Sequence, residues 1–203
     1  MSELAWASSG DAAAVADHLA RAIRAGARHL ALPGGKTPAP ILSDLAGRDL
    51  PWSEVVVRPT DERVVPADHP ASNHAALAAS LSGTGAQILP LTEQWEPRRF
   101  DLVWIGMGGD GHIASIFPNM AIAPEEPPAV RRATPDPLPP EAPFERLTLN
   151  YAALMHTDEM ILVVRGRDKK DVLEAAIAGS NDLPIARLLL ARGASVTVFW
   201  SEQ

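Results

Sequence analysis

The residues best suited to chemistry lie in one glycine-rich segment, Gly106–His112. It places a carboxylate, Asp110, two residues before an imidazole, His112. A histidine side chain titrates nearer to neutral pH than any other, which suits a general base. Glycines let the backbone lie close to a ligand. The pattern predicts catalysis by His112 with help from Asp110; the alternative is a turn braced by Asp110 beside an exposed histidine.

A second segment, Gly34-Gly35-Lys36-Thr37-Pro38, is suited to binding an anion. Its glycines allow a tight turn, and a helix that begins at Thr37 and Pro38 offers unpaired N–H groups and a positive dipole end. A nucleotide-binding P-loop would need glycine where Leu30 stands, so that motif is excluded. The segment predicts a site for one phosphate group; a plain strand-to-helix turn is the alternative.

Charged residues near these segments favour an anionic ligand. Asp61-Glu62-Arg63 follows a predicted strand, and the guanidinium of Arg63 can bind phosphate through two N–H groups. Lys169 and Lys170 open a predicted helix and bring further positive charge. Each of these features alone is typical of solvated surface. Their predicted convergence on one edge of the sheet favours a binding site.

Two other interpretations of the His112 segment are weaker. Gly106–Gly111 matches the dinucleotide fingerprint G-x-G-x-x-G, but Pro118 and Pro124 interrupt the long helix that this fold needs, and Asp110 would repel a pyrophosphate. Ser115 follows His112 by three residues and lacks the G-x-S-x-G setting of a serine nucleophile. We expect Ser115 to serve the turn or the ligand.

Strands alternating with helices must position these residues. Apolar periodicity, caps and glycine stops predict helices at 11–25, 37–45, 71–81 and 168–177, and strands at 29–32, 55–57, 100–105, 160–164 and 195–200. This order predicts an α/β fold in a single domain, residues 1–203, with a doubly wound, mainly parallel sheet flanked by helices. Ligands bind such sheets at the carboxyl ends of the strands, where the glycine segments fall.

One stretch interrupts the alternation. Eight of the nineteen prolines lie between Pro124 and Pro143, which excludes a helix or a central strand and predicts an extended surface excursion. The following residues, Glu145–Leu149, alternate between polar and apolar and predict a half-buried edge strand.

Composition excludes several classes of protein. With 203 residues, 46% hydrophobic and 21% charged, the chain is neither disordered nor membrane-spanning. A net charge of -7 argues against nucleic acid and membrane surfaces as partners. The absence of cysteine excludes disulfides and thiolate metal sites. The N-terminus has no signal-peptide pattern, so we expect a cytoplasmic protein.

Five blocks together resemble the 6-phosphogluconolactonase family, which is related in fold to glucosamine-6-phosphate deaminase. The blocks are Leu30–Pro38, Asp61–Arg63 with Ser72-Asn73, Gly106–Pro118, Arg146–Leu149, and Gly166 with Lys169. The resemblance implies hydrolysis of 6-phosphoglucono-1,5-lactone in the oxidative pentose phosphate pathway, without cofactor or metal, by a monomer or homodimer. His112 resembles the base that activates water, and Asp110 the acid beside it. Substrate-binding positions implied in the same way are Gly34, Gly35, Lys36, Thr37, Asp61, Arg63, Ser115, Lys169 and, without a defined role, Arg146.

The sequence departs from the family pattern at a few positions. Pro33 stands where serine is common, Ile113 stands where threonine is usual, and the region 82–99 is short, which bears on substrate affinity. The nearest enzyme alternative is the deaminase, but Ile113–Pro124 contains no acidic residue to assist the histidine as in that enzyme. A sugar-phosphate sensor without catalysis is the alternative from another class, and it would normally carry a DNA-binding module.

Overall fold

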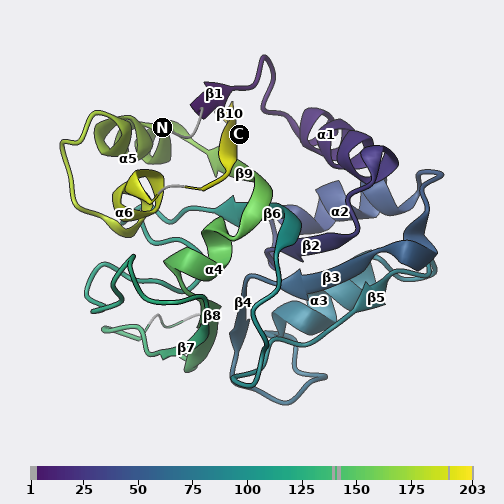
Figure 1. The fold of residues 1–203 in the computed structure, drawn as a ribbon, viewed down its shortest axis with the longest axis horizontal. Coiled ribbons are helices and arrows are strands. Elements are labelled where there is room, and N and C mark those ends of the chain that lie inside the picture. The colour runs from purple at the N-terminus through teal and green to yellow at the C-terminus, as the bar shows by residue number, and fades with distance from the viewer. Residues whose placement is uncertain (1–3, 139, 141–142, 192, 203) are drawn as a thin grey trace.

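The computed structural model describes residues 4–138, 140, 143–191 and 193–202. These residues form a seven-stranded sheet in the order β1-β10-β9-β6-β2-β3-β5, with every neighbouring pair parallel. Figure 1 shows this sheet running through the molecule. Its strands are β1 (Leu4–Trp6), β2 (His29–Leu32), β3 (Val56–Pro59), β5 (Gln87–Ile88), β6 (Phe100–Gly106), β9 (Thr157–Arg165) and β10 (Ser195–Ser201). The predicted fold class, a doubly wound and mainly parallel sheet, is confirmed.

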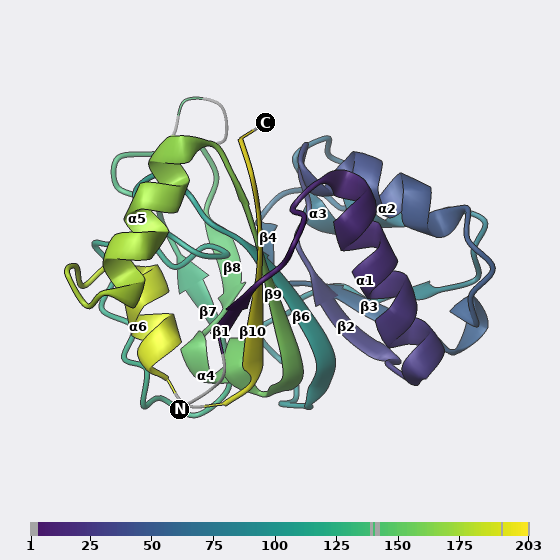
Figure 2. The same cartoon turned by 90° about the horizontal axis from the view of Figure 1, so that it is seen from above.

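Helices cover both faces of the sheet (Figure 2). One face packs against α1 (Ala12–Ala25), α2 (Pro38–Ala46) and α3 (Asn73–Ser80), and the other against α4 (Tyr151–Met155), α5 (Arg167–Ile177) and α6 (Pro184–Leu190). A short 3-10 helix, Trp52–Glu54, precedes β3. Along β6 the side chains alternate: Trp104 joins the apolar cluster of the first face, while Val103 and Ile105 join that of the second.

The predicted helix ends are largely correct. Asp11 caps α1 by accepting the N–H of Ala14, and Gly26 ends it with a φ of 118°, a left-handed conformation that favours glycine. Ser72 caps α3 in the same way. Thr37 does occupy the position before Pro38, but its side chain makes no capping hydrogen bond. The N–H groups at this helix end are therefore not taken by Thr37.

A second, three-stranded antiparallel sheet corrects two sequence-based interpretations. Its order is β4-β8-β7, with β4 at Asp61–Arg63, β7 at Val130–Ala133 and β8 at Arg146–Leu149. Asp61–Arg63, which was expected only to follow a strand, is itself a strand. The strand predicted at Glu145–Leu149 lies at the centre of this sheet instead of at an edge. The proline-rich excursion contributes the edge strand β7, an edge position being compatible with nearby prolines.

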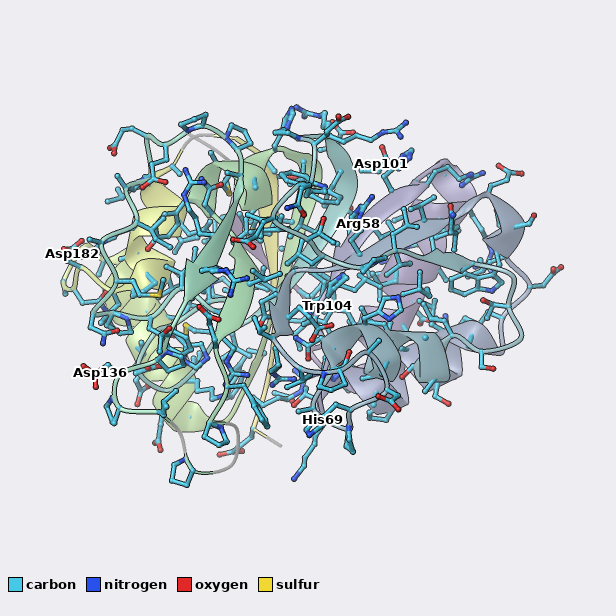
Figure 3. All side chains as sticks on the ribbon, turned by 90° about the horizontal axis from the view of Figure 1, so that it is seen from below. Arg58, His69, Asp101, Trp104, Asp136 and Asp182 are labelled. Carbon is cyan, nitrogen blue, oxygen red and sulfur yellow. The ribbon has the colours of Figure 1, made fainter. Side chains whose placement is uncertain are left out.

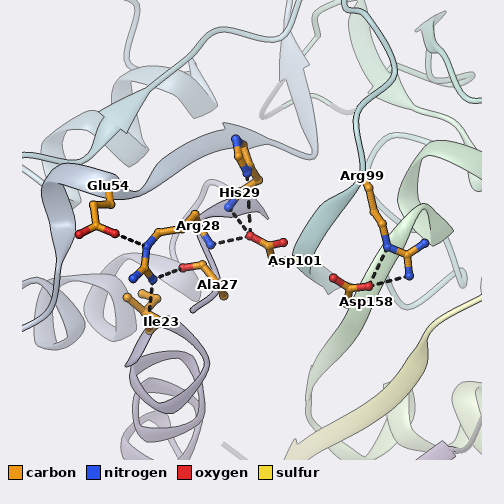
Figure 4. A network of polar contacts seen from close by, with 8 residues as sticks. All are labelled: Ile23, Ala27, Arg28, His29, Glu54, Arg99, Asp101 and Asp158. Carbon is orange, nitrogen blue, oxygen red and sulfur yellow. Dashed lines mark hydrogen bonds and ion pairs between the residues drawn. The ribbon is translucent and has the colours of Figure 1, made fainter. Parts of the chain in front are cut away.

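Polar contacts join the amino ends of β2 and β6 (Figure 4). The carboxylate of Asp101 accepts the backbone N–H groups of Arg28 at 2.5 Å and His29 at 2.8 Å. Arg28 donates to Glu54 at 2.7 Å. The two glycine segments follow β2 and β6 and so lie at the opposite, carboxyl ends of these strands. None of the helices in the described ranges is long and apolar enough to cross a membrane.

Candidate active site

The glycine-rich segment after β6 holds an aspartate–histidine pair. Nδ1 of His112 lies 2.6 Å from Oδ1 of Asp110, and the backbone N–H of His112 donates to the same oxygen at 3.2 Å. Partial burial raises the pKa of Asp110. The charge and hydrogen bonds of His112 lower this pKa by more, so it lies below the ordinary value. An ionised carboxylate only accepts, so Nδ1 of His112 must carry the proton. In the neutral form of the imidazole, Nε2 then has a lone pair, as a general base requires.

Glycine is needed at one position of this segment for a steric reason. A Cβ added at Gly108 would overlap Nδ1 and Cε1 of the His112 ring. The backbone N–H of Gly108 donates to the carbonyl of His112 at 2.9 Å and closes the loop. The ring of Phe117 also contacts the imidazole in a tilted arrangement, with centroids 5.0 Å apart. Gly108 and Phe117 therefore both limit where the ring can lie, and the His112 side chain is 34% exposed.

Ser115 connects this loop to the second sheet. Its hydroxyl donates to Oδ2 of Asp61 at 2.6 Å, and its backbone N–H donates to the hydroxyl of Thr148 at 3.2 Å. Ser115 is only 2% exposed. A buried hydroxyl bound to Asp61 is not placed to act as a nucleophile. It ties the segment of His112 to β4 and β8.

Glu62 organises the start of α3. Its carboxylate accepts the N–H groups of Asn73 and His74, each at 2.7 Å, and the hydroxyl of Ser72 at 3.1 Å. Asn73 then accepts a short hydrogen bond from Nη1 of Arg63 and donates to the carbonyl of Asp61 at 2.7 Å. A negative charge at a helix N-terminus is electrostatically favourable. Glu62 thus holds Asn73, and Asn73 orients Arg63.

The turn after β2 packs against this arrangement. A Cβ at Gly34 would overlap the side chain of Asn73, so only glycine allows the turn to approach α3 so closely. Gly35 has a φ of 109°, which glycine adopts without strain. On β4 and β8, Arg63 and Arg146 stand directly opposite one another. Burial, followed by the charge of Arg63, lowers the pKa of Arg146, although an arginine stays protonated at any ordinary pH.

Two adjoining cavities open at the carboxyl edge of the main sheet. The first has a volume of about 310 Å³ and the second about 540 Å³. They share four lining residues, namely Asp61, Arg63, His112 and Ala114. Trp104, which Figure 3 labels near the middle of the molecule, lines the first cavity from β6. His112 therefore stands where the two cavities meet.

Most of the predicted site residues line these cavities. The first is lined by Gly34, Lys36, Thr37, Asp61, Arg63, His112 and Lys169; the second by Asp61, Arg63, Asp110, His112, Ser115 and Arg146. Gly35 lines neither of the two and instead shapes the turn.

Sequence reasoning missed Thr60, Trp104 and Arg165, which also line the first cavity. The signal for Arg165 was available, because it follows the buried run Met160–Val164 and so falls at the carboxyl end of a parallel strand. As to metal binding, no group of three or more histidine, aspartate or glutamate side chains within the described ranges is arranged to hold an ion.

Known proteins are similar to this chain in sequence and in fold. Residues 7–97 and 86–200 match the model of the family described as glucosamine-6-phosphate isomerases/6-phosphogluconolactonase. A 6-phosphogluconolactonase of Neisseria meningitidis serogroup A is 32% identical over 215 residues, covering 93% of this chain and 92% of the relative.

Solved structures agree with this relationship. The crystal structure of a 6-phosphogluconolactonase from Shewanella baltica superposes with a TM-score of 0.80 at 26% identity, covering 99% of this chain and 98% of that one. A monomeric glucosamine-6-phosphate deaminase has the same fold, with a TM-score of 0.77, 16% identity and 98% of each chain covered. On the strength of the matched family model and the 32% identical relative, this chain belongs to the glucosamine-6-phosphate isomerase/6-phosphogluconolactonase family.

Proposed function

We propose that this protein hydrolyses 6-phospho-D-glucono-1,5-lactone to 6-phospho-D-gluconate, a step of the oxidative pentose phosphate pathway. The observation that carries the proposal is the position of His112, hydrogen-bonded to ionised Asp110 at the edge of a cavity rich in cationic side chains. Support also comes from relatives that are named 6-phosphogluconolactonase and that align over most of the chain.

The residues suit a single-displacement hydrolysis. Nε2 of His112 takes a proton from a water molecule, and the resulting hydroxide attacks the lactone carbonyl carbon. Negative charge on the carbonyl oxygen is stabilised by N–H groups of the glycine loop. The C–O bond to the ring oxygen then breaks, and the imidazolium returns its proton to that oxygen. Asp110 holds Nδ1–H throughout and stabilises the transient positive charge of His112.

We also assign the residues that line the cavities to two parts of the substrate, the phosphate and the sugar. Lys36, Thr37 and Lys169 line the first cavity and not the second, and are assigned to the phosphate. Asp61 and Arg63 line both cavities and are assigned to the sugar, next to the reacting carbon. We place the enzyme in the cytoplasm, because a charged phosphate ester does not cross a membrane unaided and must be hydrolysed where it is made.

The decisive experiment follows the disappearance of freshly generated 6-phosphogluconolactone above its spontaneous hydrolysis. Wild-type protein should accelerate the reaction, and His112→Asn should abolish most of the acceleration. Ammonia release from glucosamine 6-phosphate would instead favour a deaminase. Thermal stabilisation by 6-phosphogluconate without any turnover would indicate a sensor and overturn the proposal.

A further inference from the structure

Arg165 is a cation of the first cavity that neither the motifs nor the resemblance assigned. It is the last residue of β9 and lines the first cavity with Lys36 and Lys169. Together with Thr37 and Asp11, it also lines a neighbouring hollow. Arg165 therefore lies beside the turn that is suited to phosphate.

The side chain of Arg165 is held in place by backbone carbonyls. Nη1 donates to the carbonyl of Val164 at 3.2 Å and to that of Phe199 at 3.4 Å. Burial lowers its pKa, while the more distant charge of Asp11 acts in the opposite direction. Across the described ranges, no carboxylate lies within ion-pair distance of Arg165, and its Nε and Nη2 have no hydrogen-bond partner. The guanidinium is thus fixed on one side and available on the other.

The charge of the cavity supports an anionic occupant. Its ionised lining residues are four cations, Lys36, Arg63, Arg165 and Lys169, against one carboxylate, Asp61. That carboxylate already accepts the hydroxyl of Ser115. Such a concentration of positive charge is unexpected in a chain of net charge -7, unless an anion offsets it.

Lys170, the residue after Lys169, makes its contacts away from the first cavity. Its Nζ lies 4.3 Å from the ring centroid of Trp200 and 3.4 Å from a carboxylate oxygen of Glu174. Lys170 lines neither of the two cavities of the candidate site. Of the two consecutive lysines, only Lys169 is therefore placed with Arg165 at the cavity.

We propose that Arg165 binds the phosphate group of the substrate together with Lys36 and Lys169, at the end of the first cavity remote from the second. The inference rests on the proposed function. The carbonyl carbon must lie at His112, where the cavities meet, and the 6-phosphate is at the other end of the sugar acid. A planar guanidinium donates two parallel hydrogen bonds to phosphate oxygens, and its prior fixation reduces the entropy lost on binding.

The test compares Arg165→Gln with a matched control, Arg167→Gln, which alters an exposed arginine two residues away. Among the residues that the structure describes, Arg167 forms one ion pair, with Asp171 at 3.6 Å. For 6-phosphogluconolactone, Arg165→Gln should raise KM by about 10- to 100-fold with little change in kcat. KM of Arg165→Lys should lie between those of wild type and Arg165→Gln, because lysine keeps the positive charge but cannot donate two parallel hydrogen bonds. Hydrolysis of unphosphorylated glucono-1,5-lactone should be unchanged, as should every parameter of Arg167→Gln.

A purely structural role for Arg165 predicts a different pattern. Losing the contact to Phe199 would then lower Tm and reduce turnover of both lactones alike, and that result, or an unchanged KM, would overturn the inference. If wild-type protein has no lactonase activity, the proposed function fails independently. Titration with inorganic phosphate still decides on Arg165: weaker binding by Arg165→Gln than by wild type supports the assignment, and equal binding refutes it.

Discussion

Oδ1 of Asp110 lies 2.6 Å from Nδ1 of His112 and also accepts the backbone N–H of the same histidine. One carboxylate oxygen therefore fixes both the ring and the backbone of one residue. This arrangement determines which ring nitrogen carries the proton and holds the imidazole at a constant angle to the loop. The catalytic proposal depends on this pair more than on any other contact.

Replacing His112 by asparagine should lower kcat by about 10²- to 10⁴-fold, the usual contribution of a general base. KM should change little, because the phosphate and sugar are held by other residues. Steady-state kinetics on the lactone measures both. A large rise in KM with unchanged kcat would show that His112 binds substrate without activating water.

Alanine at Gly108 should displace the His112 ring, because the added Cβ overlaps it. A shift of about 1 Å is enough to reduce kcat by roughly 10²-fold. Gly109→Ala is the matched control, since a Cβ there meets no atom within 4 Å. Equal kcat values for the two variants, both folded by circular dichroism, would contradict the proposed position of the ring.

Ser115→Ala should keep kcat within about tenfold of wild type, because the hydroxyl serves Asp61 and the reaction needs no acyl-enzyme. Loss of a nucleophilic serine costs on the order of a millionfold. A drop approaching that size, or a burst of product in the first turnover, would establish covalent catalysis and exclude direct attack by water.

Glu62→Gln should raise KM by roughly tenfold and leave kcat nearly unchanged. The amide has one acceptor oxygen in place of two, so at least one donor among Ser72, Asn73 and His74 loses its partner, at a cost of about 1–3 kcal/mol. Arg63 would then lose its fixed orientation. Glu54→Gln, at the opposite edge of the sheet, is the control and should behave as wild type. If Glu62→Gln left KM unaltered, the contacts of Glu62 with the start of α3 would not contribute to substrate binding.

Asp110 should make stability depend on pH. Its pKa is lower in the folded protein than in the unfolded chain, where the pKa of an aspartate is about 3.9. The unfolded state therefore binds the proton first, so the stabilisation is full above that value and is lost as the pH falls through the folded pKa. Urea unfolding should show an advantage of wild type over Asp110→Asn that is larger at about pH 6 than at about pH 3. If the stability difference between wild type and Asp110→Asn were instead larger at about pH 3, the pKa of Asp110 would be raised on folding, which would contradict this prediction.

Local signals in the sequence predicted much of the main sheet. The buried runs that became β2, β6, β9 and β10 are apolar, and turn residues or glycines bound them. Caps such as Ser72 act within three residues and can be read from the chain alone. Because parallel strands end at one edge, the glycine segments were expected to meet, and Gly34 and His112 do line one cavity.

The second sheet could not be predicted in this way, because its pairing is entirely non-local. Asp61–Arg63 is short and charged, and only its pairing with Arg146–Leu149 makes it a strand. Nothing in either segment alone indicates the other. For the same reason the position of Arg165 beside Thr37 depends on how β9 and β2 are ordered in the sheet, which neither segment specifies.

The pairing of β4 with β8 has a consequence for biosynthesis. Arg63 leaves the ribosome before Arg146, and both line the second cavity. That side of the cavity exists only after both residues have emerged and β4 has paired with β8. A nascent chain that stops before β8 would contain the loop of His112 but no partner strand for β4. Competence for catalysis should therefore arise only after β8 has emerged and paired with β4.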